Sequence, residues 1–260
     1  MRRLAAAVVP PAVKRRHERW STTRHLAAVG PPTAAYLRRY GLTVRHGPFQ
    51  GMQYVAGLEN PPDDLVAKLT GEYEVELRDT VAEWVRAGFP HIVDVGAAEG
   101  YYAVGFAHAM PGTAVHAYDI EPLARERCAA LAARNGVQDR VVIGESCTPA
   151  TLAGLPAEGV ALLSDCEGYE RTLLDPDAAP RLRGWTILVE LHEFLDPDIR
   201  GTIVKRFAAT HDVELVEEGD HDGTGVPELE FVDPATRRRL LSERRPARMT
   251  WAVLRPHGTP

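Results

Sequence analysis

Cysteine is scarce in this sequence, which contains only three among 260 residues. Cys128, Cys147 and Cys166 are scattered and odd in number, and they lack the paired spacing of zinc ligands. The sequence therefore offers neither a disulfide framework nor a cysteine-based zinc site. Because reduced thiols are typical of the cytoplasm, we expect the protein to be cytoplasmic.

Long hydrophobic runs are also missing. No segment reaches the roughly 20 consecutive apolar residues that a membrane-spanning helix requires, so the sequence predicts no membrane span. Residues 1–13 begin like a signal peptide, with two arginines before an apolar stretch. Pro10 and Pro11 interrupt that stretch, and basic residues 14–16 stand where a small-residue cleavage site belongs. We therefore do not expect export.

The sequence lacks an excess of positive charge, since its formal net charge is -6. Nucleic-acid binding needs a basic surface that neutralises phosphates, so we do not expect a nucleic-acid partner. The exception is residues 1–46, where Glu18 is the sole acidic residue among nine arginines and one lysine. We expect this segment to be a basic, helical extension that precedes the folded domain.

The most informative segment of the chain runs from His91 to Ala107. Its short apolar run, Ile92 to Val95, is too brief for a helix and leads directly to Gly96 and Gly100. This pattern predicts a buried parallel strand followed by a tight turn and then a helix. Because glycines let a ligand approach the backbone, and the free amides of a helix start favour negative groups, the pattern indicates a nucleotide-type pocket.

Two nucleotide ligands compete for such a turn, and the spacing of the glycines distinguishes them. A dinucleotide fingerprint requires glycines where Ala98 and Tyr101 stand here, and the charge of Glu99 would repel a diphosphate. S-adenosylmethionine (SAM) carries a sulfonium and an ammonium and no phosphate, so an acidic turn suits it. The turn, with Asp94 before its first glycine, resembles the first motif of class I SAM-dependent methyltransferases. An NAD(P)-dependent oxidoreductase is the alternative enzyme.

The rest of the chain repeats the alternation of strand and helix, which predicts a doubly wound, Rossmann-like α/β fold. The sequence predicts strands at 114–118, 140–143, 159–164, 185–189, 213–217 and 249–254, helices at 69–87 and 123–134, and a short hairpin or lid at 47–55. In such folds, ligands bind at the carboxyl ends of the parallel strands. The polar residues expected to converge on one cleft there are Asp94, Asp119, Asp165, Glu167, Glu190, His192 and Glu193.

The end of the second predicted strand supplies a candidate anchor for a ribose. Asp119 follows the glycine turn by about 20 residues, where a carboxylate can accept hydrogen bonds from both ribose hydroxyls of an adenosine. Glu121, just before a proline, could serve equally. The turn that contains Ser146 follows the next strand, and we expect it to flank the adenine ring.

From about residue 47 to residue 256, the sequence resembles an FkbM-type methyltransferase, a branch of the class I fold. The resemblance rests on the turn at 94–100, on residues 165–170, which are similar to the family's Asp-x-Glu-Gly-x-Glu pattern, and on residues 189–193. It implies a seven-stranded, mostly parallel sheet with one antiparallel strand, SAM as methyl donor, and an oxygen acceptor on a sugar or secondary metabolite. Residues 118–122 depart from the family's Phe-Glu-Pro pattern, which leaves Asp119 and Glu121 both open as the ribose carboxylate.

His192 is the predicted catalytic base, with Asp165 and Glu190 beside it. An alcohol acceptor must lose a proton during methyl transfer, and an imidazole with a pKa of about 6.5 can take it at neutral pH. The sequence does not require a metal, although a divalent ion such as Mg²⁺ would acidify the acceptor hydroxyl. If a metal is present, its expected ligands are Asp165, Glu167, Glu190 and His192.

The residues predicted to bind the cofactor surround the glycine turn and the next strand ends. They are Asp94, Gly96, Ala97, Glu99, Gly100, Tyr102, Asp119, Ile120, Ser146 and Asp165. The expected partner is a small-molecule acceptor, and the sequence leaves monomer and homodimer open. A non-catalytic binding module on the same fold, with the basic residues 1–46 as its contact surface, is a further alternative.

Overall fold

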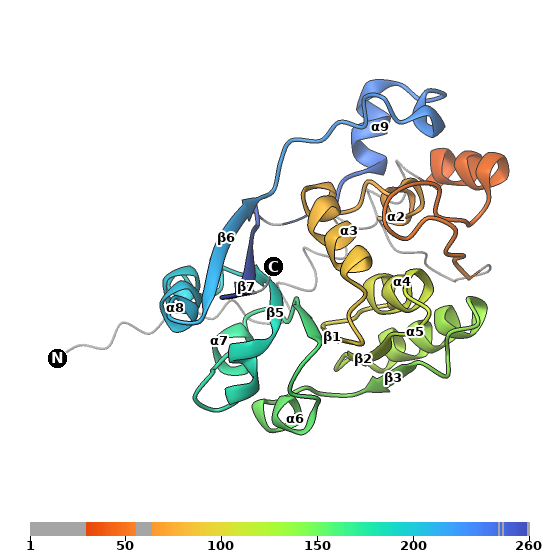
Figure 1. Ribbon diagram of the computed structural model, residues 1–260. Coiled ribbons are helices and arrows are strands. Elements are labelled where there is room, and N and C mark those ends of the chain that lie inside the picture. Colours follow the sequence, from red (N-terminus) through yellow and green to blue (C-terminus); the bar gives the residue numbers. More distant parts are fainter. Residues whose placement is uncertain (1–29, 56–63, 244, 246, 259–260) are drawn as a thin grey trace.

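The computed structural model describes residues 30–55, 64–243, 245 and 247–258. Within these residues, seven strands form one sheet in the order β3-β2-β1-β4-β5-β7-β6. Strands β1 to β5 are parallel to one another, whereas β7 is antiparallel to both β5 and β6. The predicted Rossmann-like fold, with seven mostly parallel strands of which one is antiparallel, is therefore confirmed (Figure 1).

The strands coincide with the short apolar runs of the sequence. They are β1 (His91–Val95), β2 (Ala114–Tyr118), β3 (Val141–Gly144), β4 (Val160–Ser164), β5 (Thr186–Leu191), β6 (His211–Glu217) and β7 (Thr250–Pro256). Every residue of β4 and β5 is buried. Central parallel strands are covered on both faces, which explains why their sequences read as continuous apolar runs instead of alternating ones.

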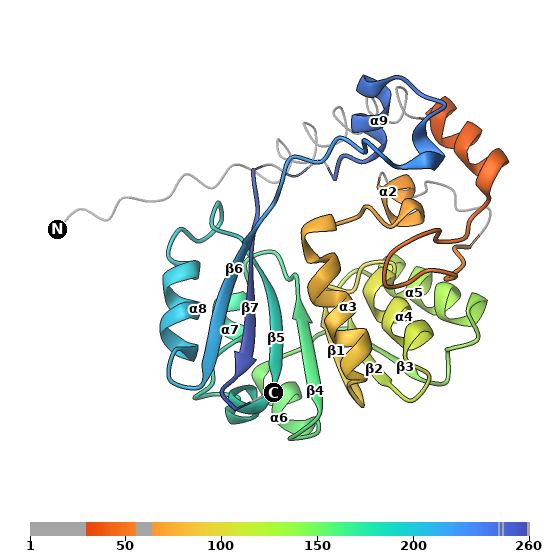
Figure 2. The ribbon, with the colours of Figure 1, turned by 45° about the horizontal axis from the view of Figure 1, so that its top comes forward.

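Helices cover both faces of the sheet (Figure 2). The α-helices are α2 (Leu65–Thr70), α3 (Arg78–Ala87), α4 (Tyr101–Ala109), α5 (Pro122–Arg134), α6 (Pro149–Gly154), α7 (Glu170–Leu173), α8 (Ile199–Phe207) and α9 (Pro234–Leu240), and the 3-10 helices are η1 (Val75–Leu77), η2 (Pro180–Gly184) and η3 (Pro227–Leu229). Residues 30–40 are α-helical as well. Helices α2 to α5 pack on one face, around Ile92 and Trp251. Helices α6 to α8 pack on the other face, around Val93 and Val189. None of the helices described is long and apolar enough to cross a membrane.

The predicted helix over residues 69–87 is wrong in its first half. Gly71 has a φ of 75° and ends α2, because a left-handed glycine stops a helix. A side chain at this position would collide with the chain before it, since a Cβ on Gly71 would lie 2.3 Å from the backbone oxygen of His46. Glu74 is also left-handed, with a φ of 44°, and the chain becomes α-helical again only at Arg78.

The predicted hairpin at residues 47–55 is a turn closed by a single antiparallel bridge between Thr43 and Gln53. Its Phe49 is buried against α4, where a Cβ on Gly105 would lie 2.5 Å from the phenyl ring. Glycine in the middle of α4 therefore lets this segment pack closely on the helix that begins at the ligand turn.

The register of the parallel strands aligns their carboxyl ends. Val95 lies opposite both Tyr118 and Ser164, and Ser164 lies opposite Val189. The residues that directly follow these positions therefore lie at one edge of the sheet. They include Gly96, Asp119, Asp165 and Glu190.

Candidate functional site

Two left-handed glycines shape the turn between β1 and α4. Gly96 has a φ of 87°, and a Cβ there would lie 1.7 Å from the backbone oxygen of Asp165. Gly100 has a φ of 94°, and its Cβ would lie 2.7 Å from Cys128 Sγ. Ala98 is left-handed as well, with a φ of 46°, a conformation that is costly for a residue with a side chain. The turn can therefore approach the end of β4 only because position 96 is a glycine.

Several backbone amides of this turn donate hydrogen bonds to other backbone atoms of the protein. Gly96 N and Ala97 N donate to the carbonyl oxygen of Tyr118 at 2.9 and 3.0 Å, and Gly100 N donates to Ala97 O at 2.8 Å. A diphosphate binds such a turn through free N–H groups. At these three positions, the turn before α4 leaves no donor for a phosphate.

Asp119 links the glycine turn to the loop after β2. Its Oδ2 accepts a hydrogen bond from Ala98 N at 2.8 Å, and its Oδ1 accepts one from Glu121 N at 2.8 Å. Each carboxylate oxygen has two lone pairs, so Asp119 keeps acceptor capacity toward a ligand. The carboxylate of Asp119 is thus held in place from both sides, whereas Glu121 lies exposed at the edge of the same pocket.

A pocket of about 580 Å³ lies at the carboxyl edge of the sheet, a size typical of small-molecule sites. It is lined by Val95, Gly96, Ala98, Tyr118, Asp119, Ile120, Glu121, Glu145, Ser146, Cys147, Thr148, Asp165, Cys166, Glu167 and Tyr169. A smaller cavity next to it is lined in part by Asp94, Ala97, Glu99 and Tyr102. The two spaces share Gly96, Ala98 and Asp165. Together they contain every predicted cofactor residue except Gly100, which packs against α5.

Asp94 near the end of β1 is a buried acid without a partner. Its exposed fraction is 1%, and neither carboxylate oxygen has a hydrogen-bond partner of normal geometry among the described residues. Burial and the nearby charge of Asp165 raise the pKa of Asp94 to about 8, although the backbone amide of Ala103 opposes this shift. Because an unpaired buried carboxylate costs free energy, this position suits a positively charged ligand group.

Glu99 is neutralised by residues that precede the turn. Its Oε1 accepts hydrogen bonds from Lys68 Nζ at 2.6 Å and from the Tyr54 hydroxyl at 3.4 Å, and Lys68 also pairs with Asp64 at 3.0 Å. Burial would raise the pKa of Glu99, but the Lys68 ammonium holds it below its usual range. The side chain of Glu99 therefore ties the turn to α2, and Asp94 is the acid of this turn that lacks a partner.

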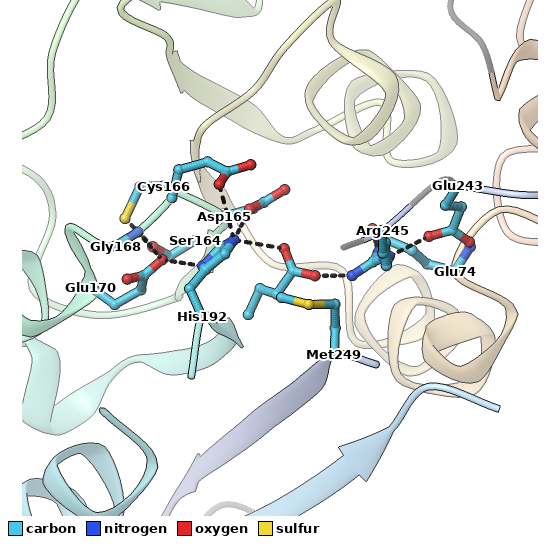
Figure 3. A network of polar contacts seen from close by, with 12 residues as sticks. Glu74, Ser164, Asp165, Cys166, Gly168, Glu170, His192, Glu243, Arg245 and Met249 are labelled. Carbon is cyan, nitrogen blue, oxygen red and sulfur yellow. Dashed lines mark hydrogen bonds and ion pairs between the residues drawn. The ribbon is translucent and has the colours of Figure 1, made fainter. Parts of the chain in front are cut away.

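His192, which follows β5, is surrounded by carboxylates (Figure 3). Its Nδ1 lies 2.6 Å from Glu170 Oε1, and its Nε2 lies 3.3 Å from Glu190 Oε2, 3.4 Å from Asp165 Oδ1 and 3.8 Å from Glu167 Oε2. Burial would lower the pKa of His192, but the hydrogen bond with Glu170 and the surrounding negative charges raise it above its usual range. The structure thus brings the three predicted catalytic residues together.

Arg245 and Glu74 extend this network toward α4 (Figure 3). The Arg245 guanidinium contacts Glu190, Glu74 and Glu243, and the Tyr102 hydroxyl donates to Glu74. Burial raises the pKa of Glu74 to about 7, although the charge of Arg245 opposes this shift. The predicted cofactor residue Tyr102 is therefore connected to Glu190 through two buried charged side chains.

Four members of the network were not predicted as catalytic or cofactor residues: Glu170, Glu74, Glu243 and Arg245. Glu170 belongs to the predicted segment 165–170, and its position at the start of the short helix α7 gives no sign that it binds a histidine. Arg245 lies 55 residues from Glu190 and 171 residues from Glu74 in sequence. No local sequence pattern predicts a contact between residues that are so far apart in the chain.

One predicted member of the cleft lies elsewhere. Glu193 Oε2 accepts a hydrogen bond from Arg200 Nη2 at 2.7 Å, and the same nitrogen donates to Thr250 Oγ1 at 2.9 Å. Glu193 therefore connects the loop after β5 to α8 and β7, and it does not join the carboxylates around His192.

No protein-family model matches the chain, and no curated protein matches it either. Among solved structures, it is similar to the O-methyltransferase TomG of Streptomyces achromogenes, at 16% identity over 76% of this chain and 82% of that one, with a TM-score of 0.45. An rRNA methylase from Streptococcus thermophilus is 9% identical over 77% and 99% of the two chains, with a TM-score of 0.48. An O-methyltransferase from Bacillus cereus is 14% identical over 74% and 96%, with a TM-score of 0.43. At these identities and TM-scores, the activity of this chain has to be inferred from its own site.

Proposed function

We propose that this protein is a SAM-dependent methyltransferase of class I. The observation that carries the proposal is the unpaired, buried carboxylate of Asp94 beside a turn whose amides at Gly96, Ala97 and Gly100 are already hydrogen bonded. A site of this kind favours a ligand that brings positive charge and no phosphate. SAM meets both conditions through its ammonium and sulfonium groups.

The residues present fit SAM. The pocket of about 580 Å³ has room for an adenosine, and Asp119 would accept hydrogen bonds from its ribose hydroxyls. Ile120 and Ser146 line the same pocket and would flank the adenine ring. Asp94 lines the smaller cavity and would form an ion pair with the ammonium group of SAM. When bound, SAM supplies an electrophilic methyl group, so the protein mainly has to position the acceptor and manage its proton.

His192 is the base in this proposal. Glu170 can only accept the hydrogen bond from Nδ1, so Nδ1 carries the proton of the neutral ring and Nε2 presents its lone pair. Nε2 would take the proton of the acceptor oxygen, and the charges of Asp165 and Glu190 would stabilise the imidazolium that forms. Because its pKa is raised, His192 should need a higher pH than an ordinary histidine before Nε2 is free to take a proton.

The acceptor that suits this arrangement is a hydroxyl group on a sugar or another secondary metabolite. Support comes from the polar residues Asp165 and Glu167, which line the large pocket and lie within reach of His192. It also comes from the sequence resemblance to FkbM-type methyltransferases, whose acceptors are of this class. In this proposal, residues 47–256 form the methyltransferase domain.

A nicotinamide-dependent oxidoreductase fits the site less well. Its dinucleotide would place a diphosphate against the turn, where the amides of Gly96, Ala97 and Gly100 have no free N–H group. It would also bring negative charge close to the unpaired carboxylate of Asp94. Both features disfavour the dinucleotide.

Methyl transfer from isotopically labelled SAM to a panel of sugars and polyhydroxylated metabolites tests the proposal. We expect His192→Gln to bind S-adenosylhomocysteine (SAH) like the wild type while turnover falls about 100-fold or more, the usual effect of losing a general base. Glu193→Gln is the matched control, because Glu193 is close in sequence but pairs with Arg200. Full turnover by His192→Gln would remove His192 from the mechanism, and failure of the wild type to bind SAM or SAH would reject the function itself.

A further inference from the structure

Asp165, Glu190 and His192 each direct one potential metal-ligand atom toward a common point. One atom from each residue lies within 4.8 Å of the other two. His192 Nε2 is 3.4 Å from Asp165 Oδ1 and 3.3 Å from Glu190 Oε2. Because β4 and β5 are adjacent and parallel, residues that follow them in sequence meet at this edge of the sheet.

The buried imidazole of His192 provides a second, independent observation. The side chain is 2% exposed, and Glu170 holds its Nδ1 at 2.6 Å, so the lone pair of Nε2 faces two carboxylate oxygens. Oδ1 of Asp165 is enclosed and has no hydrogen-bond partner among the residues described. A cation between this lone pair and the anionic oxygens, either a proton on Nε2 or a metal ion, removes the repulsion between them. Histidine ligands of metals are held in this way, with a carboxylate on the nitrogen away from the ion.

The spacing of these atoms matches metal ligands better than a shared proton. A charge-assisted N–H···O bond is about 2.7 to 2.9 Å long, shorter than both of the Nε2 distances. Neighbouring ligands of an octahedral ion are separated by about 1.4 bond lengths, so 3.3 and 3.4 Å correspond to bonds of about 2.3 to 2.4 Å. These values are longer than the bonds of about 2.0 to 2.1 Å that Mg²⁺ demands, and they lie within the range of about 2.3 to 2.6 Å for the larger Ca²⁺.

We infer that Asp165, Glu190 and His192 bind a divalent cation, with Glu170 as the positioning residue behind His192. Two carboxylates and one imidazole suit a divalent ion larger than Mg²⁺, such as Mn²⁺. Arg245 donates a hydrogen bond to Oε1 of Glu190, so Oε2, which lies near His192 Nε2, is the oxygen that would bind the ion.

The open side of this cation site faces the large pocket. Asp165 and Glu167 both line that pocket, and the Glu167 side chain is 77% exposed, with Oε2 3.8 Å from His192 Nε2. A hydroxyl oxygen that enters from the pocket can bind the cation, which lowers the pKa of the hydroxyl. With the cation bound, Nε2 is a ligand and cannot act as the base. In the cation-bound protein the proton of the hydroxyl therefore passes to Glu167 or to solvent, whereas His192 is the base of the metal-free site. This role rests on the proposed function, whereas binding of the cation does not.

Titration with Mn²⁺ tests the inference on the full-length protein after removal of metals with a chelator. The electron paramagnetic resonance signal of free Mn²⁺ gives the number of bound ions and the dissociation constant. We expect one saturable site per chain in the wild type. We expect binding to be at least about 10-fold weaker in Asp165→Asn and His192→Gln, and about 10-fold weaker in Glu170→Gln, which loses only the group behind the histidine. Glu193→Gln should bind like the wild type.

Two outcomes would overturn the inference. One is the absence of saturable Mn²⁺ binding by the wild type up to about 1 mM, the weak end of natural divalent-cation sites. The other is wild-type affinity in Asp165→Asn, which retains the histidine and replaces a partly exposed carboxylate with an amide of the same shape. Calorimetric titration of the same samples with SAH separates the two proposals. Intact SAH binding without Mn²⁺ binding rejects only the cation site, and loss of SAH binding in the wild type rejects the methyltransferase.

Discussion

Asp94→Asn should make the free protein more stable at alkaline pH while it weakens SAM binding. The carboxylate of Asp94 is buried without a partner, and its pKa is about 8 in the folded chain. An unfolded aspartate has a pKa of about 3.9. As the pH rises between these values, the unfolded chain releases its proton and the folded chain retains it, so the folded state loses stability. Asparagine has the same shape and no proton to lose, and it removes this pH dependence.

The size of the effect follows from the difference between the two pKa values. Each unit is worth about 1.4 kcal/mol, so between about pH 5 and pH 8 the contribution of Asp94 is at most about 4 kcal/mol. Local rearrangement and entry of water reduce such penalties in real proteins, and we expect about 2 kcal/mol. A difference of this size is easily resolved, because a small domain is stabilised by only about 5 to 15 kcal/mol in total.

Urea unfolding of the ligand-free protein at the two pH values measures this difference. The wild type should lose about 2 kcal/mol more than Asp94→Asn on going from the lower to the higher pH. Asp139→Asn is the matched control, because Asp139 is exposed in a loop, and it should follow the wild type. Identical pH dependence in wild type and Asp94→Asn would refute the conclusion that this carboxylate is strained by burial.

Three further predictions follow from the turn and the histidine. Gly96→Ala should destabilise the protein by at least about 2 kcal/mol more than Gly88→Ala in thermal unfolding. Both glycines are left-handed, but only at position 96 would a Cβ collide with a neighbouring backbone atom. Equal losses of stability would contradict this collision. Asp119→Ala should weaken SAH binding at least about 10-fold in calorimetry, and Glu121→Ala should weaken it less. A larger loss of affinity in Glu121→Ala than in Asp119→Ala would make Glu121 the ribose anchor. Glu170→Gln should shift the rising limb of the pH–rate profile to lower pH, because the carboxylate raises the pKa of the catalytic histidine; an unshifted profile would exclude this coupling.

The fold and the position of the site could be predicted because both depend on local patterns. Short apolar runs that end in polar clusters identify buried parallel strands, and parallel strands place those clusters at one edge. This rule alone brings Asp165, Glu190 and His192 together, and the structure has them within hydrogen-bonding or ion-pairing distance. The same rule fails for Glu193, because it gives the edge at which a residue lies and not the direction of its side chain.

The charge state of the site could not be predicted, because it depends on residues that are distant in sequence. Glu99 looks like a free acid of the turn, but Lys68, 31 residues earlier, neutralises it. Arg245 reaches Glu190 and Glu74 from near the end of the chain. Such pairings arise from tertiary packing, and neither periodicity nor motif spacing contains them. The break at Gly71 was missed for a related reason, since the glycine is required by its contact with His46.

Calorimetric titration of the purified protein with SAH, and separately with NAD⁺, tests the central claim most directly. Asp94 and the hydrogen-bonded amides of Gly96, Ala97 and Gly100 predict saturable binding of one SAH per chain and no binding of NAD⁺. Binding of SAH should be weaker in Asp94→Asn. Saturable binding of NAD⁺ without binding of SAH would contradict it.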